Sequence, residues 1–255
     1  MSFLGGGFEG FTFLDMTDEM PRVAAHWARL GLEFQAIYSG FLGSERQIGI
    51  VEDFIRRFRR PDTVVVVDPV MGDFGRVYQT YTAAMCDGMA RLAALADVIT
   101  PNLTEAALLL GQPYETLPAG EAGLRQITER LSLEGRRSVV LTGASLAPGQ
   151  TGAVCFDART GQIQVVQTAY IAHEFHGTGD VFSSVLTGAL VRGASLAEAA
   201  GEAAGFVRAC AERTAAEDLP MRVIERLGVS RYLQVKEGNH AVIYCRKAIH
   251  GSRNQ

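Results

Sequence analysis

The residues whose types and spacing could most directly do chemistry are Gly177-Thr178-Gly179-Asp180, which precede an apolar run from Val181 to Val191. The glycines leave backbone N–H groups open to approach, and the helix that the apolar run predicts adds partial positive charge at its start. Such a helix start attracts phosphate, whereas a carboxylate there would repel it. Asp180 is therefore suited to take a proton from a group that attacks the phosphate, and the stretch indicates phosphoryl transfer.

Other polar residues follow the predicted strands. The β-branched run Val64 to Val67 suits a strand buried on both faces of a parallel sheet, and it ends at Asp68-Pro69. Ligands bind beyond the carboxyl ends of such strands, so polar residues at these ends should converge. Carboxylates and amides suit Mg²⁺ and its waters, and hydroxyl and backbone N–H groups suit phosphate oxygens. The residues at predicted strand ends are Asp68, Thr100, Asn102, Thr142 and Gly143.

The elements that must position these residues alternate between helix and strand. Apolar periodicity and capping signals predict helices over 18–30, 44–58, 83–96, 104–110, 120–133, 181–191, 196–216 and 221–227. Continuous or alternating apolar runs predict strands over 34–39, 64–67, near 98, over 138–142 and over 241–245, and a hairpin over 152–156 and 163–167. This pattern predicts a three-layer α/β/α sandwich with a mostly parallel central sheet, formed as a single domain over residues 1–255.

Composition excludes several classes of protein. The net charge of −4 argues against a nucleic-acid or anionic-membrane partner, because both select basic surfaces. The four cysteines are far apart, which is typical of reduced thiols in a cytoplasmic protein. No run approaches a membrane span, and Met1 to Gly10 lacks the pattern of a secretory signal. The only lysines are Lys236 and Lys247, and neither follows a glycine, which excludes a Walker-A nucleotide site.

The same residues also have purely structural interpretations. Gly177 to Asp180 could be a glycine-rich helix start capped by an acid, and Asp68 could cap a turn before proline. Without further context Phe41 is more often a core aromatic than a platform for a ligand. His173 and His176 could suggest a metal, but no third cluster of ligands accompanies them.

Four motifs taken together are far more specific than any one alone. The four motifs are Asp68-Pro69-Val70-Met71-Gly72-Asp73, Thr100-Pro101-Asn102-Leu103-Thr104-Glu105, Leu141-Thr142-Gly143 and Gly177-Thr178-Gly179-Asp180. They occur in the order and at roughly the spacing of the ribokinase-like superfamily, and most closely resemble pyridoxal (pyridoxamine) kinases over nearly the whole chain.

The resemblance implies an ATP-dependent kinase that acts on the 5′-hydroxymethyl group of a vitamin B6 vitamer, with Mg²⁺ as cofactor and a homodimeric state. Asp180 matches the general base. The anion hole for the transferred phosphoryl group matches Gly177, Thr178 and Gly179. The residues that organise Mg²⁺ and its waters match Asp68, Asn102 and Glu105. The positions around the ATP phosphates match Asp73, Thr100, Thr142 and Gly143. Whether a monovalent cation is also required is left open.

On the substrate side, the resemblance places Phe41 against the pyridine ring and His176 in contact with it. The family's first strand, helix and strand have no counterpart here, so Leu4 and Gly5 stand where a substrate-binding His and Thr are expected. The shortened start should leave the 34–39 strand as an open edge. The adenine pocket is expected from the 206–224 region.

Two alternatives stay open. One is a kinase for another hydroxymethyl substrate such as hydroxymethylpyrimidine, although those relatives usually carry Cys at the position of Asp180. The other is a nucleotide- or vitamer-binding form with little turnover, because substrate-side groups are missing.

Overall fold

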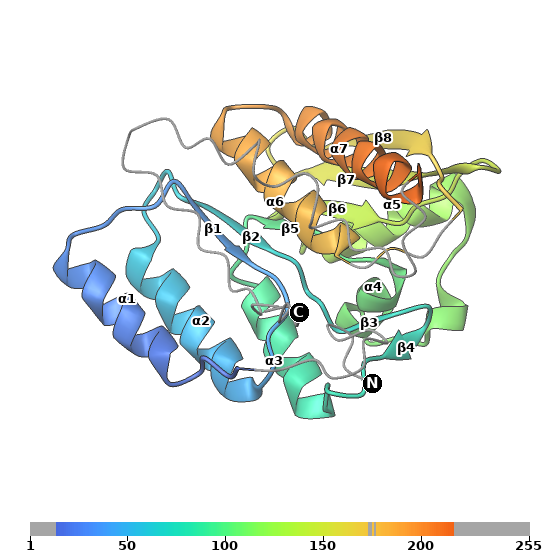
Figure 1. The fold of residues 1–255 in the computed structure, drawn as a ribbon. Helices are drawn as coiled ribbons and strands as arrows, with labels where there is room; N and C mark the ends of the chain where they lie inside the picture. The colour runs from blue at the N-terminus through green and yellow to red at the C-terminus, as the bar shows by residue number, and fades with distance from the viewer. Residues whose placement is uncertain (1–13, 173–174, 176, 217–255) are drawn as a thin grey trace, which may run out of the picture.

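The structure is a computed structural model that describes residues 14–172, 175 and 177–216 (Figure 1). The predicted site residues Gly5 and His176, the predicted helix over 221–227 and the predicted strand over 241–245 lie outside the described residues. The helices are α1 (Glu19–Arg29), α2 (Glu45–Phe58), α3 (Ala83–Ala93), α4 (Leu103–Leu109), α5 (Gly120–Leu131), α6 (Thr178–Val191) and α7 (Leu196–Ala216). The strands are β1 (Ala36–Ser39), β2 (Val64–Val67), β3 (Gly72–Asp73), β4 (Arg76–Val77), β5 (Val98–Ile99), β6 (Ser138–Thr142), β7 (Gln150–Asp157) and β8 (Gln162–Ala169).

The central sheet has six strands in the order β1-β2-β5-β6-β7-β8. The first four run parallel to one another, and β7 and β8 are added as an antiparallel hairpin. The mostly parallel sheet and the hairpin are both confirmed. Because parallel strands share a direction, the carboxyl ends of β1, β2, β5 and β6 meet at one edge, where the predicted site residues follow them.

Helices cover both faces of this sheet, and the β2 run shows why. Val65 and Val67 pack into a core beneath α1 to α5, whereas Val66 packs into a second core beneath α6 and α7. All three side chains are fully buried, as expected for a continuous β-branched strand between two helical layers. Figure 1 shows α6 and α7 together on one face and α1, α2 and α3 on the other. The predicted three-layer sandwich is confirmed.

Local details differ from the sequence expectations. Ser44 accepts a hydrogen bond from the Gln47 N–H at 3.2 Å and caps α2 as predicted. The Gln47 side chain, however, accepts from the Gly43 N–H at 2.7 Å, one residue before the position expected in a capping box. The short hairpin β3–β4 and a 3-10 helix at Tyr114–Thr116 were not predicted, because two- and three-residue elements leave no periodic signal.

The strand β1 ends the sheet on one side within the described part of the chain, where it pairs only with β2. Its four side chains are nonetheless all buried. None of the described helices has the length and apolar character needed to cross a membrane.

Candidate active site

The start of α6 presents the strongest predicted motif at the carboxyl edge of the sheet. Gly177 is the N-cap residue and has φ of 84°, a left-handed conformation that favours glycine. Thr178, Gly179 and Asp180 form the first turn of the helix, where backbone N–H groups have no partner within the helix. No side chain caps this helix start, so its geometry suits an anion, and the anion site itself stays a prediction.

Buried hydroxyl groups tie α6 to the ends of two strands. The Thr100 hydroxyl at the end of β5 donates to Asp68 Oδ1 at 3.0 Å, and the Ser183 and Thr100 hydroxyl oxygens are 3.0 Å apart. The Ser183 hydroxyl also hydrogen-bonds to the Asp68 carboxylate, and both hydroxyl groups act to lower the pKa of Asp68 against the larger effect of burial. This network fixes α6 against the residues that follow β2 and β5.

Asp68 and Asp180 form a pair of acids across this junction. Asp68 is 5% exposed, and burial together with the nearby negative charge of Asp180 raises the pKa of Asp68 to about 7. Asp68 also lies close to the start of α6, because a Cβ built on Gly179 would be 3.6 Å from Asp68 Oδ2. Burial and a neighbouring like charge both disfavour the ionised form of a carboxyl group, which is why the pKa of Asp68 rises.

The acid Asp180 also has a partner in β1. The Tyr38 hydroxyl donates to Asp180 Oδ1 at 3.5 Å, and the Tyr38 ring is buried between the sheet and α6. Tyr38 was not predicted as a site residue. The signal that could have found it is a phenol hydroxyl one residue before the end of a predicted strand, close to the edge where the other polar residues gather.

The start of α4 holds the second predicted cluster. Asn102 Oδ1 accepts from the Glu105 N–H at 2.9 Å, and Glu105 Oε2 accepts from the Asn102 N–H at 2.9 Å, which makes a capping box. Glu105 Oε1 also accepts from the Met71 N–H at 3.1 Å. Burial is the largest cause that raises the pKa of Glu105, followed by the charge of Asp68. The side chains of Asn102 and Glu105 thus both accept hydrogen bonds from backbone N–H groups of the protein itself.

The β3–β4 hairpin is attached to the same helix start. Asn102 Nδ2 donates to the Gly72 carbonyl at 2.8 Å, and the Gly75 N–H donates to the Thr104 hydroxyl at 2.8 Å. Asp73 lies in this hairpin, and burial raises its pKa. These contacts place Asp73 near Glu105, whose pKa its charge also raises.

The remaining predicted residues lie around this centre. Thr142 ends β6, where its N–H donates to the Pro101 carbonyl at 2.8 Å, and Gly143 follows with φ of 71°. Phe41 follows β1 and packs edge-on against Tyr81, with ring centroids 6.0 Å apart. Phe41 is only partly buried, and its role as a platform for the substrate ring stays a prediction.

Oxygen donors at this edge fit a hard cation such as Mg²⁺. Burial, and after it the charge of Asp180, raises the pKa of Asp68, and a bound cation would offset both effects by favouring the ionised carboxylate. The side-chain oxygens of Asn102 and Glu105 already accept hydrogen bonds from backbone N–H groups. These two residues would therefore act mainly by holding the backbone around the start of α4 in place. Within the described ranges, no three His, Cys, Asp or Glu side chains are grouped to hold a metal ion alone. Mg²⁺ bound here would share its ligands with phosphate oxygens and water, which is its usual mode.

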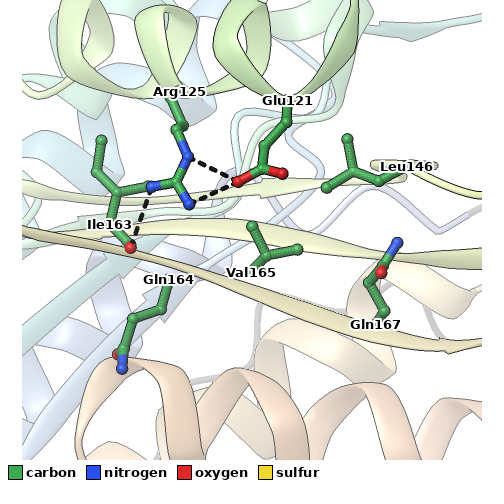
Figure 2. A pocket seen from close by; sticks show the side chains of 7 residues that line it. All are labelled: Glu121, Arg125, Leu146, Ile163, Gln164, Val165 and Gln167. Atoms are coloured by element: carbon green, nitrogen blue, oxygen red, sulfur yellow. Dashed lines mark hydrogen bonds and ion pairs between the residues drawn. The ribbon is translucent and has the colours of Figure 1, made fainter.

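A cavity of about 610 Å³ lies elsewhere, between α5 and β8 (Figure 2). Its lining includes Arg125, whose guanidinium donates to Glu121 and to the Ile163 carbonyl. None of the predicted site residues lines this cavity.

Ser183 is a further residue that sequence reasoning missed. It lies three residues after Asp180 in α6, so both side chains project from the same face of the helix. That spacing was available as a signal, but no local pattern indicated that Thr100 would lie opposite.

Comparison with known families matches residues 19–219 to the family described as phosphomethylpyrimidine kinase. A pyridoxal kinase from Deinococcus radiodurans is 31% identical over 168 residues, which cover 64% of this chain and 56% of that relative. The chain therefore spans about half the length of this relative.

Two solved structures are similar throughout the sandwich. The crystal structure of pyridoxal kinase from Lactobacillus plantarum has a TM-score of 0.76 and 30% identity, covering 85% of this chain and 76% of that one. A Bacteroides thetaiotaomicron structure that carries the name phosphomethylpyrimidine kinase and was obtained with pyridoxal has a TM-score of 0.75 and 41% identity, covering 81% and 73%. The expected ribokinase-like fold and the resemblance to pyridoxal kinases are confirmed.

Proposed function

The chain belongs to the phosphomethylpyrimidine kinase family, and on that premise we propose that it transfers the γ-phosphoryl group of ATP to the 5′-hydroxymethyl group of pyridoxal, pyridoxamine or pyridoxine. The observation that carries the proposal is the position of Asp180. It lies in the first turn of α6, beside Asp68 and within the helix that Ser183 ties to Thr100. A proton acceptor and open backbone donors thus meet at one helix start, as phosphoryl transfer requires.

In the proposed reaction Asp180 takes the proton of the substrate hydroxyl as its oxygen attacks the γ-phosphorus. The new oxygen–phosphorus bond forms as the bond from the γ-phosphorus to the bridging oxygen of ADP breaks, and ADP leaves with that electron pair. The N–H groups at Gly177, Thr178 and Gly179 would stabilise the transferring phosphoryl oxygens. Bound Mg²⁺, held through Asp68 and phosphate oxygens, would neutralise phosphate charge.

The vitamer is favoured over hydroxymethylpyrimidine by the residue at position 180. The family's name keeps hydroxymethylpyrimidine as the second candidate, whereas the Bacteroides structure was obtained with pyridoxal. Those kinases usually carry Cys where this chain has Asp180, whereas pyridoxal kinases combine Thr and Asp as Thr178 and Asp180 do.

The test is direct. Purified protein is incubated with Mg·ATP and each vitamer, or with hydroxymethylpyrimidine, and phosphorylated product is measured by mass spectrometry. We expect vitamer phosphate from the wild type and a loss of roughly 10³-fold in kcat for Asp180→Asn, the size of a lost general base. Absence of product from the wild type, or equal rates in Asp180→Asn, would falsify the proposal. Faster turnover of hydroxymethylpyrimidine in direct competition would replace the vitamer by the second candidate.

A further inference from the structure

Tyr38 is a polar residue buried beside the candidate base. It lies in β1, is 2% exposed, and packs with Phe182 and Leu186 of α6 in the core beneath α6 and α7. Its hydroxyl donates to Asp180 Oδ1 at 3.5 Å. A tyrosine ring this tightly enclosed has few alternative rotamers, so the hydroxyl is held at a fixed place next to the carboxylate.

Gly40 shows how closely the surroundings fit this pair. A Cβ built on Gly40 would lie 2.9 Å from Tyr38 Oη and 3.2 Å from Asp180 Oδ1, so the backbone of Gly40 rests directly on both groups. The contact between Tyr38 and Asp180 therefore lies immediately beneath the turn that leads into Phe41, the predicted platform for the substrate ring. Glycine is required here because a side chain would press on the pair.

The chemistry of the pair gives Tyr38 a role. A phenol donates one hydrogen bond, and a carboxylate has two oxygens that accept. A hydrogen bond from Tyr38 to Oδ1 therefore limits how the Asp180 carboxylate can rotate. Repulsion from Asp68 would otherwise turn the Asp180 side chain away from the strand ends. The 3.5 Å separation is long for a hydrogen bond, and such bonds commonly shorten when the substrate binds.

We propose that Tyr38 is a positioning residue for this kinase reaction, and that its hydroxyl holds the Asp180 carboxylate in the orientation from which it takes the substrate proton. The inference rests on the proposed function. It assigns a role to a residue of β1 that none of the four sequence motifs contains.

The first test is Tyr38→Phe, which keeps the buried ring and removes only the hydroxyl. We expect kcat to fall roughly tenfold, the size of one hydrogen bond to a charged group, while KM for ATP and for the vitamer stays within about twofold. An unchanged kcat, or a loss confined to KM, would overturn the inference.

A double-mutant cycle distinguishes positioning from a general loss of stability. If Tyr38 acts through Asp180, then Tyr38→Phe in an Asp180→Asn background should cause no further loss in the residual rate. A further tenfold loss in that background would mean that Tyr38 acts independently, and would overturn the inference. The matched control is Tyr81→Phe, which removes a buried hydroxyl that donates to the Leu42 carbonyl at 3.0 Å. Its effect on the rate should be the same factor in both backgrounds.

Gly40→Ala provides a second route to the same pair. The added methyl group should displace the Tyr38 hydroxyl, so we expect a loss in kcat at least as large as that of Tyr38→Phe, with the two losses not additive. Additive losses, or full activity in Gly40→Ala, would count against the inference. If the wild type itself turns over no substrate, the proposed function fails and the inference fails with it. If the wild type is active and both variants match it, only the inference fails.

Discussion

Two helix starts meet at the carboxyl edge of the sheet, and they use their polar groups in opposite ways. At α4 a capping box consumes the Asn102 and Glu105 side chains, and Glu105 also binds the Met71 N–H. At α6 the N-cap is Gly177, which offers no side chain. The charged group in its first turn, Asp180, is approached by Tyr38 from β1.

The difference indicates which helix start serves folding and which serves chemistry. A buried donor or acceptor must be satisfied for the chain to fold, so the closed start of α4 stabilises the protein by itself. The start of α6 has no side-chain cap and brings the charge of Asp180 near buried Asp68, which costs stability. We therefore expect the α4 cluster to support the site and the α6 cluster to take part in the reaction.

The largest expected effect is a loss of stability when the capping box of α4 is removed. Glu105→Ala removes the acceptor for two backbone N–H groups, so we expect the free energy of unfolding to fall by about 3 kcal/mol. Asp180→Asn at the other helix start should change it by less than about 1 kcal/mol, because relief of the repulsion from Asp68 compensates for the lost charge. Urea denaturation of both variants measures the two values. Equal losses in stability would remove the distinction between the helix starts.

The next effect is the pH dependence of stability. The pKa of Asp68 is raised from 3.8 to about 7, so the folded protein binds this proton more tightly than the unfolded chain. The free energy of unfolding should therefore be highest at the acid end of this window and fall as pH rises, by about 2 kcal/mol between pH 5 and pH 7. The raised pKa of Glu105 acts in the same direction.

Urea denaturation without Mg²⁺ or ATP, repeated from pH 5 to pH 8, measures this slope. In Asp68→Asn the slope should decrease, and the variant should be more stable than the wild type at pH 8 although it loses kinase activity. A wild-type free energy of unfolding that stays constant or increases over this range would show that the pKa of Asp68 is not raised in the folded protein.

The smallest effect compares two neighbouring serines of α6. Ser183→Ala breaks the tie to Thr100 and should cost about 1 kcal/mol in stability together with a several-fold loss in kcat. Ser184→Ala is the matched control, because the Ser184 hydroxyl donates to the Asp180 carbonyl within the same helix. Thermal denaturation and kinetics should separate the two variants. If they behave alike, the tie between α6 and β5 does not position the base.

Much of the fold could be predicted from the sequence because its signals are long and periodic. The run Val64 to Val67 predicted a strand buried on both faces, and α7 matches its predicted bounds of 196–216. The hairpin β3–β4 could not be predicted, because side-chain contacts from Asn102 and Thr104 hold it in place. The roles assigned to Mg²⁺, the homodimer and the cytoplasmic location stay predictions.

The sequence by itself determined the polar residues that end each strand and the acid that begins α6, because these are local motifs with fixed spacing. Only the tertiary structure decided how they are held. Tyr38 and Asp180 are 142 positions apart along the chain, and Thr100 and Ser183 are 83 apart, so their hydrogen bonds exist only once α6 has packed across the sheet. The tertiary structure likewise decided that Glu105 has a second partner besides its own helix start. The Met71 N–H, in the segment that follows β2, donates to it.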